Sequence, residues 1–436
     1  MAILFNNVSI LSEDMEILEH KDVLVEGEVF SSIADHDDVY ESNQKSKGTQ
    51  VIDGSKKVLL PGFINTHSHA PMTIVRGVGE GLPLSDWLGK AIWPIEGKLD
   101  DDVAYWASLL ANAEMLKFGC TSYSDMYFFT KARIKAAQEA GIKMNVCDGA
   151  TMVFVDTDYD SLDVKKINDW LMTEVHGKGN GKIRADFCIH GEYTTPQSMI
   201  ERVVQEAHKY NTGIHLHLSE TKKEVEECKE RHQGMSPVEY FNSLGVFDVS
   251  VTAAHCVWTD DNDLDILKSK DVSCAINPSS NMKLGSGFAP VARMLEKGIN
   301  VCLGTDGVAS NNALNMLRDA YLFALIYKGA ALDPTVAGPN DVMRAMTING
   351  ARAQGRTDTG RIKEGFKADA CLFNLDEVSM VPCTDVLTNI IYSSNGSEIK
   401  LTMVDGEIVY KDGSFTHIDI EKVKYELTVA FERITA

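Results

Sequence analysis

The middle of the chain alternates short apolar runs with longer stretches of helical spacing. Between about residues 58 and 364, eight runs have the branched or alternating character of strands: residues 62–69, 119–127, 142–150, 185–193, 213–220, 251–258, 272–280 and 299–307. Strand-like runs that alternate with helix-like stretches are typical of a parallel sheet with crossover helices. We therefore predict an α/β fold for this part of the chain.

Two of the helix-like stretches carry ordinary helix punctuation. The stretch 101–119 ends on Gly119, and the stretch 194–211 has Pro196 at a first-turn position. Eight β/α units over about 300 residues fit a (β/α)₈, TIM-like barrel better than a doubly wound sheet, which would offer a Gly-rich phosphate turn that the sequence lacks. The predicted barrel occupies residues 58–364.

Strand-like runs at both chain ends predict a second, smaller unit. Residues 22–34 and 400–413 each hold two β-type runs around a turn, and the Asp405-Gly406 pair in the second is a strong hairpin signal. Residues 365–375 add another strand. We predict a β-sandwich domain made of residues 1–57 and 365–436, with a C-terminal helix at 420–434.

Composition and charge exclude several classes of partner. The 436 residues are 44% hydrophobic, and the formal net charge is −21. Nucleic-acid binding depends on clustered Lys and Arg, so no nucleic-acid partner is expected. No apolar run reaches the roughly 18 residues that span a bilayer, so no membrane partner is expected.

The N-terminal sequence and the cysteines predict a cytoplasmic protein. The start has no basic leader and carries acids at Glu13, Asp14 and Glu16, unlike a secretory signal. The nine cysteines show no CxxC spacing, and most fall in strand-like runs. We expect buried thiols in a reducing compartment rather than disulfides or a thiolate metal site.

Histidines and carboxylates gather where the predicted barrel strands end, which is where active sites of such barrels lie. Five of the twelve histidines and two carboxylates occupy these positions: His67, His69, His190, His217, His255, Glu220 and Asp306. His67 and His69 alternate along one strand, so their side chains share a face. Three imidazoles and a carboxylate are a suitable ligand set for Zn²⁺ or a similar divalent ion. Such an ion can lower the pKa of its water from about 15.7 to roughly 7, and a nearby Glu220 can move protons, so the set predicts a hydrolytic site.

Each position also has a structural alternative. His215 shares a strand face with His217, but it lies farther from the strand end, so we expect it in the barrel interior. His190 and His255 could instead be hydrogen-bonded residues of the core. Asp306 is suited to capping the helix that follows it, and Asp125 to tying a loop.

The chain resembles the amidohydrolase superfamily, and specifically its 5′-methylthioadenosine/S-adenosylhomocysteine deaminase branch. The matching stretches cover nearly the whole chain: PGFINTHSHAPMTIVRG, WPIE, HLSET, AAHC, NPSSNMKLGSG and GTDGVASNN. The resemblance implies a metal-dependent deamination in which an adenosine-type nucleoside yields the inosine product and ammonia. The substrates it implies are 5′-methylthioadenosine, S-adenosylhomocysteine, 5′-deoxyadenosine or adenosine.

The resemblance also assigns a role to each candidate residue. It implies one divalent metal, most often zinc, with iron or nickel as alternatives, on His67, His69, His217 and Asp306. Glu220 would be the proton shuttle, His255 would hold or polarise the attacking water or the substrate, and Asp306 would also take a proton. Substrate contacts would come from Glu96 to the ribose hydroxyls, His190 to the purine or sugar, and Trp87 in the pocket wall. Dinuclear relatives use a lysine on strand 4, and residues 185–193 contain none, so one metal is expected.

One departure from the family bears on the substrate. Members that accept S-adenosylhomocysteine can hold its carboxylate with arginines after strand 3, whereas no arginine occurs here between Arg133 and Arg184. Lys165, Lys166 or a neighbouring subunit of a homo-oligomer would have to substitute. The smaller nucleosides are therefore equal or better candidates. The alternatives are a guanine deaminase, a triazine or chlorinated-ring hydrolase and, more remotely, an inactive barrel scaffold.

Overall fold

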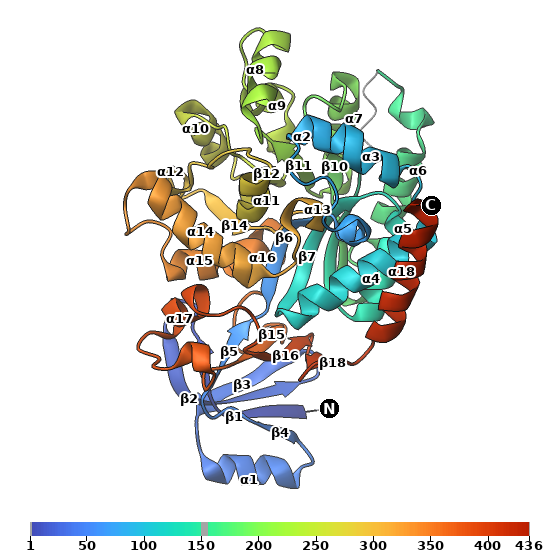
Figure 1. The fold of residues 1–436 in the computed structure, drawn as a ribbon. Coiled ribbons are helices and arrows are strands. Elements are labelled where there is room, and N and C mark those ends of the chain that lie inside the picture. Colours follow the sequence, from blue (N-terminus) through green and yellow to red (C-terminus); the bar gives the residue numbers. More distant parts are fainter. Residues whose placement is uncertain (1, 150–155, 436) are drawn as a thin grey trace.

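The computed structural model describes residues 2–149 and 156–435. A barrel of parallel strands ringed by helices forms the larger part, and a sheet from both chain ends lies below it in the view of Figure 1. The barrel strands are β6 (Phe63–Ser68), β7 (Cys120–Tyr127), β8 (Lys143–Asp148), β9 (Ile183–Ala185), β10 (Phe187–Ile189), β11 (Ile214–Leu218), β12 (Val251–His255), β13 (Ser273–Ile276) and β14 (Asn300–Leu303). Each of the eight predicted ranges overlaps a barrel strand, with β9 and β10 together forming the fourth, so the predicted barrel is confirmed. Ala150, the last residue of the range 142–150, lies outside the described residues.

The barrel wall consists of two parallel arcs, β6-β7-β8-β9 and β10-β11-β12-β13-β14. At the join between β9 and β10, the Asp186 N–H donates to the Val146 carbonyl at 3.0 Å. At the other join, the Asp306 N–H donates to the His67 carbonyl at 2.9 Å. Barrel closure therefore brings residues from the first and the last strand into direct contact.

Helices surround the barrel and connect its strands. They are α4 (Asp101–Lys117), α5 (Thr130–Ala140), α6 (Asp163–Trp170), α7 (Gln197–Tyr210), α8 (Lys222–Arg231), α9 (Pro237–Ser243), α10 (Asp261–Ser269), α11 (Pro278–Lys283), α12 (Val291–Glu296), α13 (Val308–Asn311), α14 (Met316–Ala331), α15 (Pro339–Met346) and α16 (Ile348–Ala353). Short 3₁₀ or π turns lie at η3 (Tyr159–Ser161), η4 (Leu171–Val175), η5 (Gly179–Gly181) and η6 (Val246–Asp248). The predicted helix 101–119 is α4, whose N-cap Asp100 accepts a hydrogen bond from the Val103 N–H. The predicted helix 194–211 begins later, at Gln197, because the extended backbone of Pro196 forms its N-cap instead of its first turn.

A chain of short turns between β6 and α4 contributes side chains to the pocket at the barrel mouth. It comprises η1 (Ala70–Val75), α2 (Leu84–Asp86), η2 (Trp87–Ile92) and α3 (Trp93–Glu96). The π-helical spacing of η2 widens the turn between the two α-helical pieces. This segment carries Trp87 and Glu96, two of the predicted substrate contacts.

The sheet from the chain ends has the order β18-β17-β16-β15-β5-β1-β2-β3, with β4 paired to β1. Its strands are β1 (Ala2–Leu11), β2 (Ile17–Glu26), β3 (Val29–Asp35), β4 (Gln50–Asp53), β5 (Lys57–Pro61), β15 (Ala370–Asn374), β16 (Ile399–Val404), β17 (Glu407–Lys411) and β18 (Ser414–Phe415). The Phe30 N–H of β3 donates to the Phe366 carbonyl at 3.0 Å, so the sheet curls until this edge meets the chain before β15. It thereby encloses its own apolar core. The strand β5 runs across the predicted boundary between residues 57 and 58.

Two hairpins show how closely the chain ends meet. The Asp405-Gly406 turn joins β16 to β17 with positive φ at both residues (47° and 75°), as a two-residue hairpin turn requires, so the predicted hairpin is confirmed. A Cβ at Gly406 would lie 2.0 Å from the carbonyl oxygen of Gly27 in the β2–β3 turn. Only glycine fits this contact. The remaining elements here are α1 (Asp38–Ser46), η7 (Val378–Met380), α17 (Val386–Tyr392) and α18 (Ile420–Thr435), and α18 packs along α4 (Figure 1).

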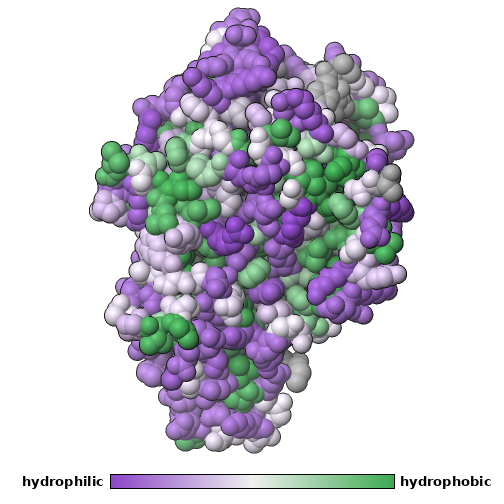
Figure 2. Space-filling model, viewed as in Figure 1, coloured by the Kyte–Doolittle hydropathy of each residue, from purple (hydrophilic) through white to green (hydrophobic). Residues whose placement is uncertain are grey.

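The face of the molecule seen in Figure 2 is predominantly polar. Apolar residues lie in separate patches across its middle. Among the described residues, none of the helices has the length and apolar character needed to cross a bilayer. Eight of the nine cysteines are buried, as expected, and Cys383 is exposed.

A buried ion cluster connects the barrel floor to the sheet. Lys143, the first residue of β8, lies 2.5 Å from an Asp369 carboxylate oxygen and 2.6 Å from one of Asp405. All three side chains are at most 3% exposed. Burial raises the pKa of Asp405, and the Lys143 ammonium opposes that rise. Lys143 thus pairs with two carboxylates between the two parts of the protein, and Lys182 lies 3.8 Å from the second of them.

Replacing this cation should destabilise the whole chain. We expect Lys143→Met to lower the free energy of unfolding by about 3–5 kcal/mol, because it removes the ion-pair partner of Asp369 and the shorter of the two ion pairs of Asp405, which lies 3.8 Å from Lys182. Urea unfolding followed by circular dichroism would measure the change. Lys166→Met is the matched control, since Lys166 and its partner Asp163 are both exposed. Equal effects of the two substitutions would contradict the role of the buried cluster.

Candidate metal centre and active site

Three histidines at the ends of β6 and β11 each have their Nδ1 atom in contact with a neighbouring residue. His69 Nδ1 donates to the Met126 carbonyl at 2.5 Å, and His217 Nδ1 donates to the His190 carbonyl at 2.7 Å. His67 Nδ1 lies 2.9 Å from Nε2 of His215. With Nδ1 engaged in each case, Nε2 keeps a lone pair for another partner, as is usual for histidines that bind metals.

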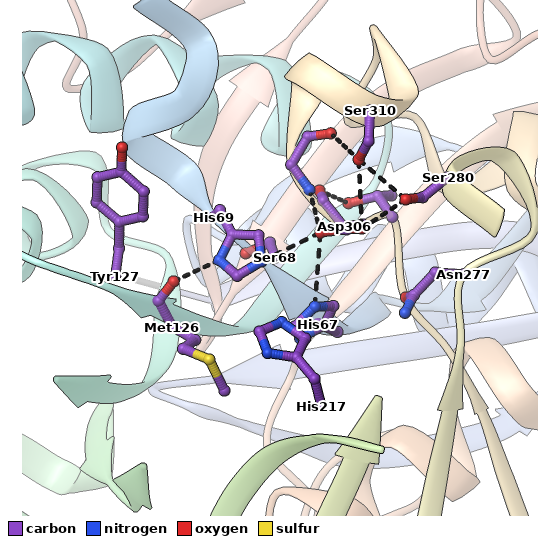
Figure 3. Close-up of polar contacts among 12 residues, drawn as sticks. His67, Ser68, His69, Met126, Tyr127, His217, Asn277, Ser280, Asp306 and Ser310 are labelled. Carbon is purple, nitrogen blue, oxygen red and sulfur yellow. Dashed lines mark hydrogen bonds and ion pairs between the residues drawn. The ribbon is translucent and has the colours of Figure 1, made fainter. Parts of the chain in front are cut away.

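Asp306 follows β14 and completes the group (Figure 3). Its Oδ1 atom lies 3.5 Å from His67 Nε2 and 3.2 Å from His69 Nε2. Its Oδ2 atom accepts hydrogen bonds from Ser280 Oγ at 2.6 Å and Ser310 Oγ at 3.2 Å. The two serines therefore fix one carboxylate oxygen while the other faces the imidazoles. The residue has φ = 61°, a left-handed conformation that needs such support.

The geometry of these residues fits one divalent cation. Ligand atoms bound about 2.1 Å from a common ion lie roughly 3–4 Å apart, which matches the distances from Asp306 to His67 and His69. Of the three groups of described residues whose ligand atoms lie within 4.8 Å of one another, two are at this site: His67, His69 and Asp306, and His67, His217 and His255. His67 belongs to both groups, and its fully buried Nε2 has no hydrogen-bond partner. A cation at this point would satisfy that atom.

The protonation equilibria also favour a positive charge here. Burial lowers the pKa of His67 to about 4. Burial also disfavours the charged form of His69, but the Asp306 carboxylate outweighs it and raises the pKa of His69 to about 9. Burial opposes ionisation of Asp306, and its contacts with the two imidazoles nevertheless hold its pKa well below the usual value. The carboxylate therefore stabilises a cation between itself and His69.

Glu220 and His255 lie beside this group and face each other. His255 Nε2 is 3.8 Å from a Glu220 carboxylate oxygen, and the Ser286 hydroxyl donates to the other at 3.3 Å. His255 Nδ1 donates to Asn281 Oδ1 at 2.9 Å, which leaves Nε2 directed at Glu220. Burial raises the pKa of Glu220, and His255 partly offsets that rise. A carboxyl group with a raised pKa is suited to accepting and returning a proton.

The pocket above the group holds about 680 Å³ of space, part of it open to solvent. The predicted substrate contacts Glu96, His190 and Trp87 all line it. The Tyr127 hydroxyl donates to Glu96 at 2.5 Å, and burial raises the pKa of Glu96. Burial lowers the pKa of His190 to about 3, so this ring stays neutral. Most of the remaining wall is apolar, with Met72, Leu84, Leu88, Trp93, Met126, Phe128 and Leu284 among its residues.

The pocket contains no lysine or arginine among the residues that the structure describes. The two lysines considered as substitutes for an arginine lie on α6 and form ion pairs with their own helix. Lys165 pairs with Asp169 at 2.5 Å and Lys166 with Asp163 at 2.9 Å. Neither lysine lines the pocket.

Several residues that support the site were not assigned this role from the sequence. His215, expected in the barrel interior, is buried there and also contacts His67. Asp125, considered as a loop-tying residue, accepts hydrogen bonds from the Ser68 hydroxyl at 3.0 Å and the Ala70 N–H at 2.7 Å. It is paired with the fully buried Arg133. A polar residue within a strand-like run was the available signal for both His215 and Asp125.

Comparison with known proteins identifies the family. A sequence model described as the amidohydrolase family matches residues 58–409. The chain belongs to the amidohydrolase family. The metal-dependent chemistry of this family agrees with the group of possible metal ligands at the barrel mouth.

Individual relatives cover almost the full length. The chain is 39% identical over 432 residues to a 5-methylthioadenosine/S-adenosylhomocysteine deaminase of Thermoanaerobacter pseudethanolicus, with 98% of each chain aligned. It is 38% identical to a 5′-deoxyadenosine deaminase of Methanocaldococcus jannaschii, covering 93% of this chain and 94% of that one. The solved structure of an adenosine deaminase from Xanthomonas campestris with bound zinc superposes with a TM-score of 0.90 at 27% identity, over 100% of this chain and 98% of that one.

The contact between His215 and His67 leads to a prediction about metal affinity. We expect His215→Leu to weaken zinc binding by about 10- to 100-fold, because His67 loses the partner that orients its ring. Competition with a chromophoric chelator would measure the dissociation constant. His208→Leu, at an exposed position on α7, should leave affinity unchanged. Unchanged affinity in the His215 variant would show that the contact does not orient His67.

Proposed function

We propose that this protein is a metal-dependent hydrolytic deaminase of adenosine-type nucleosides. The main support is one arrangement: an apolar pocket with the His/Asp group and Glu220 at its inner end and a buried carboxylate, Glu96, in its wall. The inner end is equipped for hydrolysis of a ring amine, and the wall carboxylate is suited to sugar hydroxyls. Relatives named as deaminases of 5-methylthioadenosine and 5′-deoxyadenosine support the same conclusion.

Hydrolysis of the purine amine requires a water nucleophile and controlled proton transfer. His67, His69, His217 and Asp306 would hold a divalent cation, which would supply a Lewis acid able to lower the pKa of water to about 7. Glu220 takes a proton from the water that attacks C6 and delivers it to N1. The hydroxyl now on C6 then gives its remaining proton, through Glu220 or Asp306, to the exocyclic amine, which leaves as ammonia while the oxygen stays on C6. His255 contacts Glu220 and is placed to hold the attacking oxygen.

The sugar and its 5′ substituent determine which nucleosides fit. Glu96 accepts hydrogen bonds from the ribose hydroxyls, while neutral His190 contacts the purine or sugar and Trp87 packs against the ligand. The described lining contains no lysine or arginine to pair with a carboxylate. Neutral 5′ groups, as in 5′-methylthioadenosine, 5′-deoxyadenosine and adenosine, therefore fit better than the zwitterionic chain of S-adenosylhomocysteine.

The proposal also covers which metal ion is bound and in which cellular compartment the protein acts. We propose zinc, because three imidazoles and one carboxylate suit it, with iron or nickel as alternatives. The many buried cysteines are compatible with the reducing cytoplasm. Assembly into a homo-oligomer and the division into a barrel of residues 58–364 and a β-domain of residues 1–57 and 365–436 stay predictions.

A substrate panel tests the proposed activity. The zinc-loaded protein should release ammonia from 5′-methylthioadenosine, 5′-deoxyadenosine and adenosine, and removal of metal by a chelator should abolish the activity until zinc returns. We expect kcat/KM for S-adenosylhomocysteine to be at least about tenfold lower than for 5′-butylthioadenosine, a neutral analogue of similar length, because an unpaired carboxylate costs more than about 1.4 kcal/mol to desolvate. Equal values would contradict the charge argument. Inactivity toward the whole panel with zinc bound would support the scaffold alternative.

A substitution of Glu96 distinguishes a nucleoside deaminase from an enzyme that acts on free bases. We expect Glu96→Ala to reduce kcat/KM for adenosine-type substrates by about 10- to 100-fold, since hydrogen bonds to a charged group contribute about 1.5–3 kcal/mol. Zinc content should stay the same. Glu80→Ala is the control, because Glu80 is exposed and outside the pocket lining. Turnover of guanine that falls equally in Glu96→Ala would instead favour a free-base deaminase.

A further inference from the structure

Glu224 is a buried carboxylate that faces the backbone of the loop carrying Glu220. It is the third residue of α8, after the N-cap Thr221. Its two oxygens accept hydrogen bonds from three successive N–H groups: Ser219 at 2.9 Å, Glu220 at 2.7 Å and Thr221 at 3.3 Å. The side chain does not line the pocket, so it has no direct access to a substrate.

An ordinary helix cap does not need this arrangement. In a capping box the third-residue side chain bonds the N-cap N–H, which here is the weakest of the three contacts. The two shorter bonds go to Ser219 and Glu220, outside the helix. Burial and the neighbouring Glu220 charge raise the pKa of Glu224 to about 7, so the carboxylate is costly to keep at this place. Its strongest contacts are therefore with the loop that precedes the helix.

The loop needs support because its backbone is strained. Ser219 has φ = 50°, which costs an ordinary residue about 1–2 kcal/mol. Its carbonyl accepts a hydrogen bond from the Trp258 N–H at 2.8 Å, which ties it to the chain after β12. Glu224 fixes the N–H side of the same residues. The backbone of Glu220 is thus held from two directions while its side chain points to Ser286 and His255.

We propose that Glu224 is the positioning residue of Glu220 and that it sets the geometry of proton transfer through the loop 219–221. This inference rests on the proposed hydrolytic function of Glu220. Loss of the Glu224 contacts lets the loop relax and moves the Glu220 carboxylate away from the reacting atoms. Metal binding is unaffected, because His217 lies on β11 and is held by the His190 carbonyl.

A double-mutant cycle tests this role. Glu224→Gln should lower kcat about 10- to 100-fold, the range expected when a supporting residue is lost, with little change in KM or zinc content. In a Glu220→Ala background the same substitution should change kcat less than twofold, since its effect passes through Glu220. Additive losses in the double variant would overturn the proposal. Glu226→Gln is the matched control, because Glu226 is an exposed residue of the same helix.

Two further measurements separate positioning from folding and from substrate choice. Amide hydrogen exchange should accelerate at residues 219–221 in Glu224→Gln and stay unchanged in the control, whatever the substrate is; unchanged exchange would overturn the proposal. Glu224→Asp keeps the charge, so its kcat should be higher than that of Glu224→Gln. If the Gln variant does not fold, the comparison is with Glu220→Ala. A kcat of Glu224→Asp no higher than that of the comparison variant would count against the proposal. Inactivity of wild-type protein on every nucleoside would instead refute the proposed function.

Discussion

The buried Asp306 carboxylate is the interaction on which the site depends. A negative charge this far from water is unfavourable unless it has a cationic or hydrogen-bonded partner. Here His69 and His67 lie 3.2 and 3.5 Å from one oxygen, and two serine hydroxyls hold the other. The carboxylate therefore creates a place where positive charge is stable. That positive charge can be a proton on His69, whose pKa is raised to about 9, or a metal ion bound by the imidazole nitrogens.

Barrel topology allows many polar groups to gather at one site without disrupting the apolar core. The strands carry their apolar side chains into a continuous core, and the chemistry is confined to their C-terminal ends. The opposite end is used differently, since Lys143 begins β8 and binds two carboxylates of the composite sheet. One end of the same strands thus anchors a second sheet, and the other is left free for a pocket.

Local patterns made much of the fold predictable. Strand-length apolar runs located all eight barrel strands, and the Asp405-Gly406 pair located a hairpin because few other dipeptides adopt its backbone angles. The start of α7 was misplaced, since Pro196 is compatible both with a first turn and with the extended cap that the structure shows. The curl of the sheet also escaped prediction, because it depends on contacts between β3 and the chain before β15.

Some features of the candidate site could likewise be predicted from the sequence, and others could not. His67 and His69 stand out by their spacing, and strand ends are recognisable, so the groups brought together at the mouth could be named from the sequence. Their orientation could not. The partner of His67 is His215, 148 positions away, and only the closed barrel shows which ring nitrogen each histidine keeps free. Sequence patterns locate side chains on a strand, whereas tautomer and direction depend on neighbours from other strands.

The carboxylates of the site have different roles that follow from their surroundings. Asp306 is held ionised by imidazoles, whereas Glu220 has its pKa raised by burial and can exchange a proton. Glu224 accepts three backbone N–H groups and faces away from the pocket. Glu96 sits in an apolar wall with the Tyr127 hydroxyl as its partner. Three of these acidic groups, Asp306, Glu220 and Glu96, line a pocket whose described lining has no lysine or arginine, so the pocket favours neutral ligands over anions. Electrostatics thus contributes to substrate selection as well as to the chemistry.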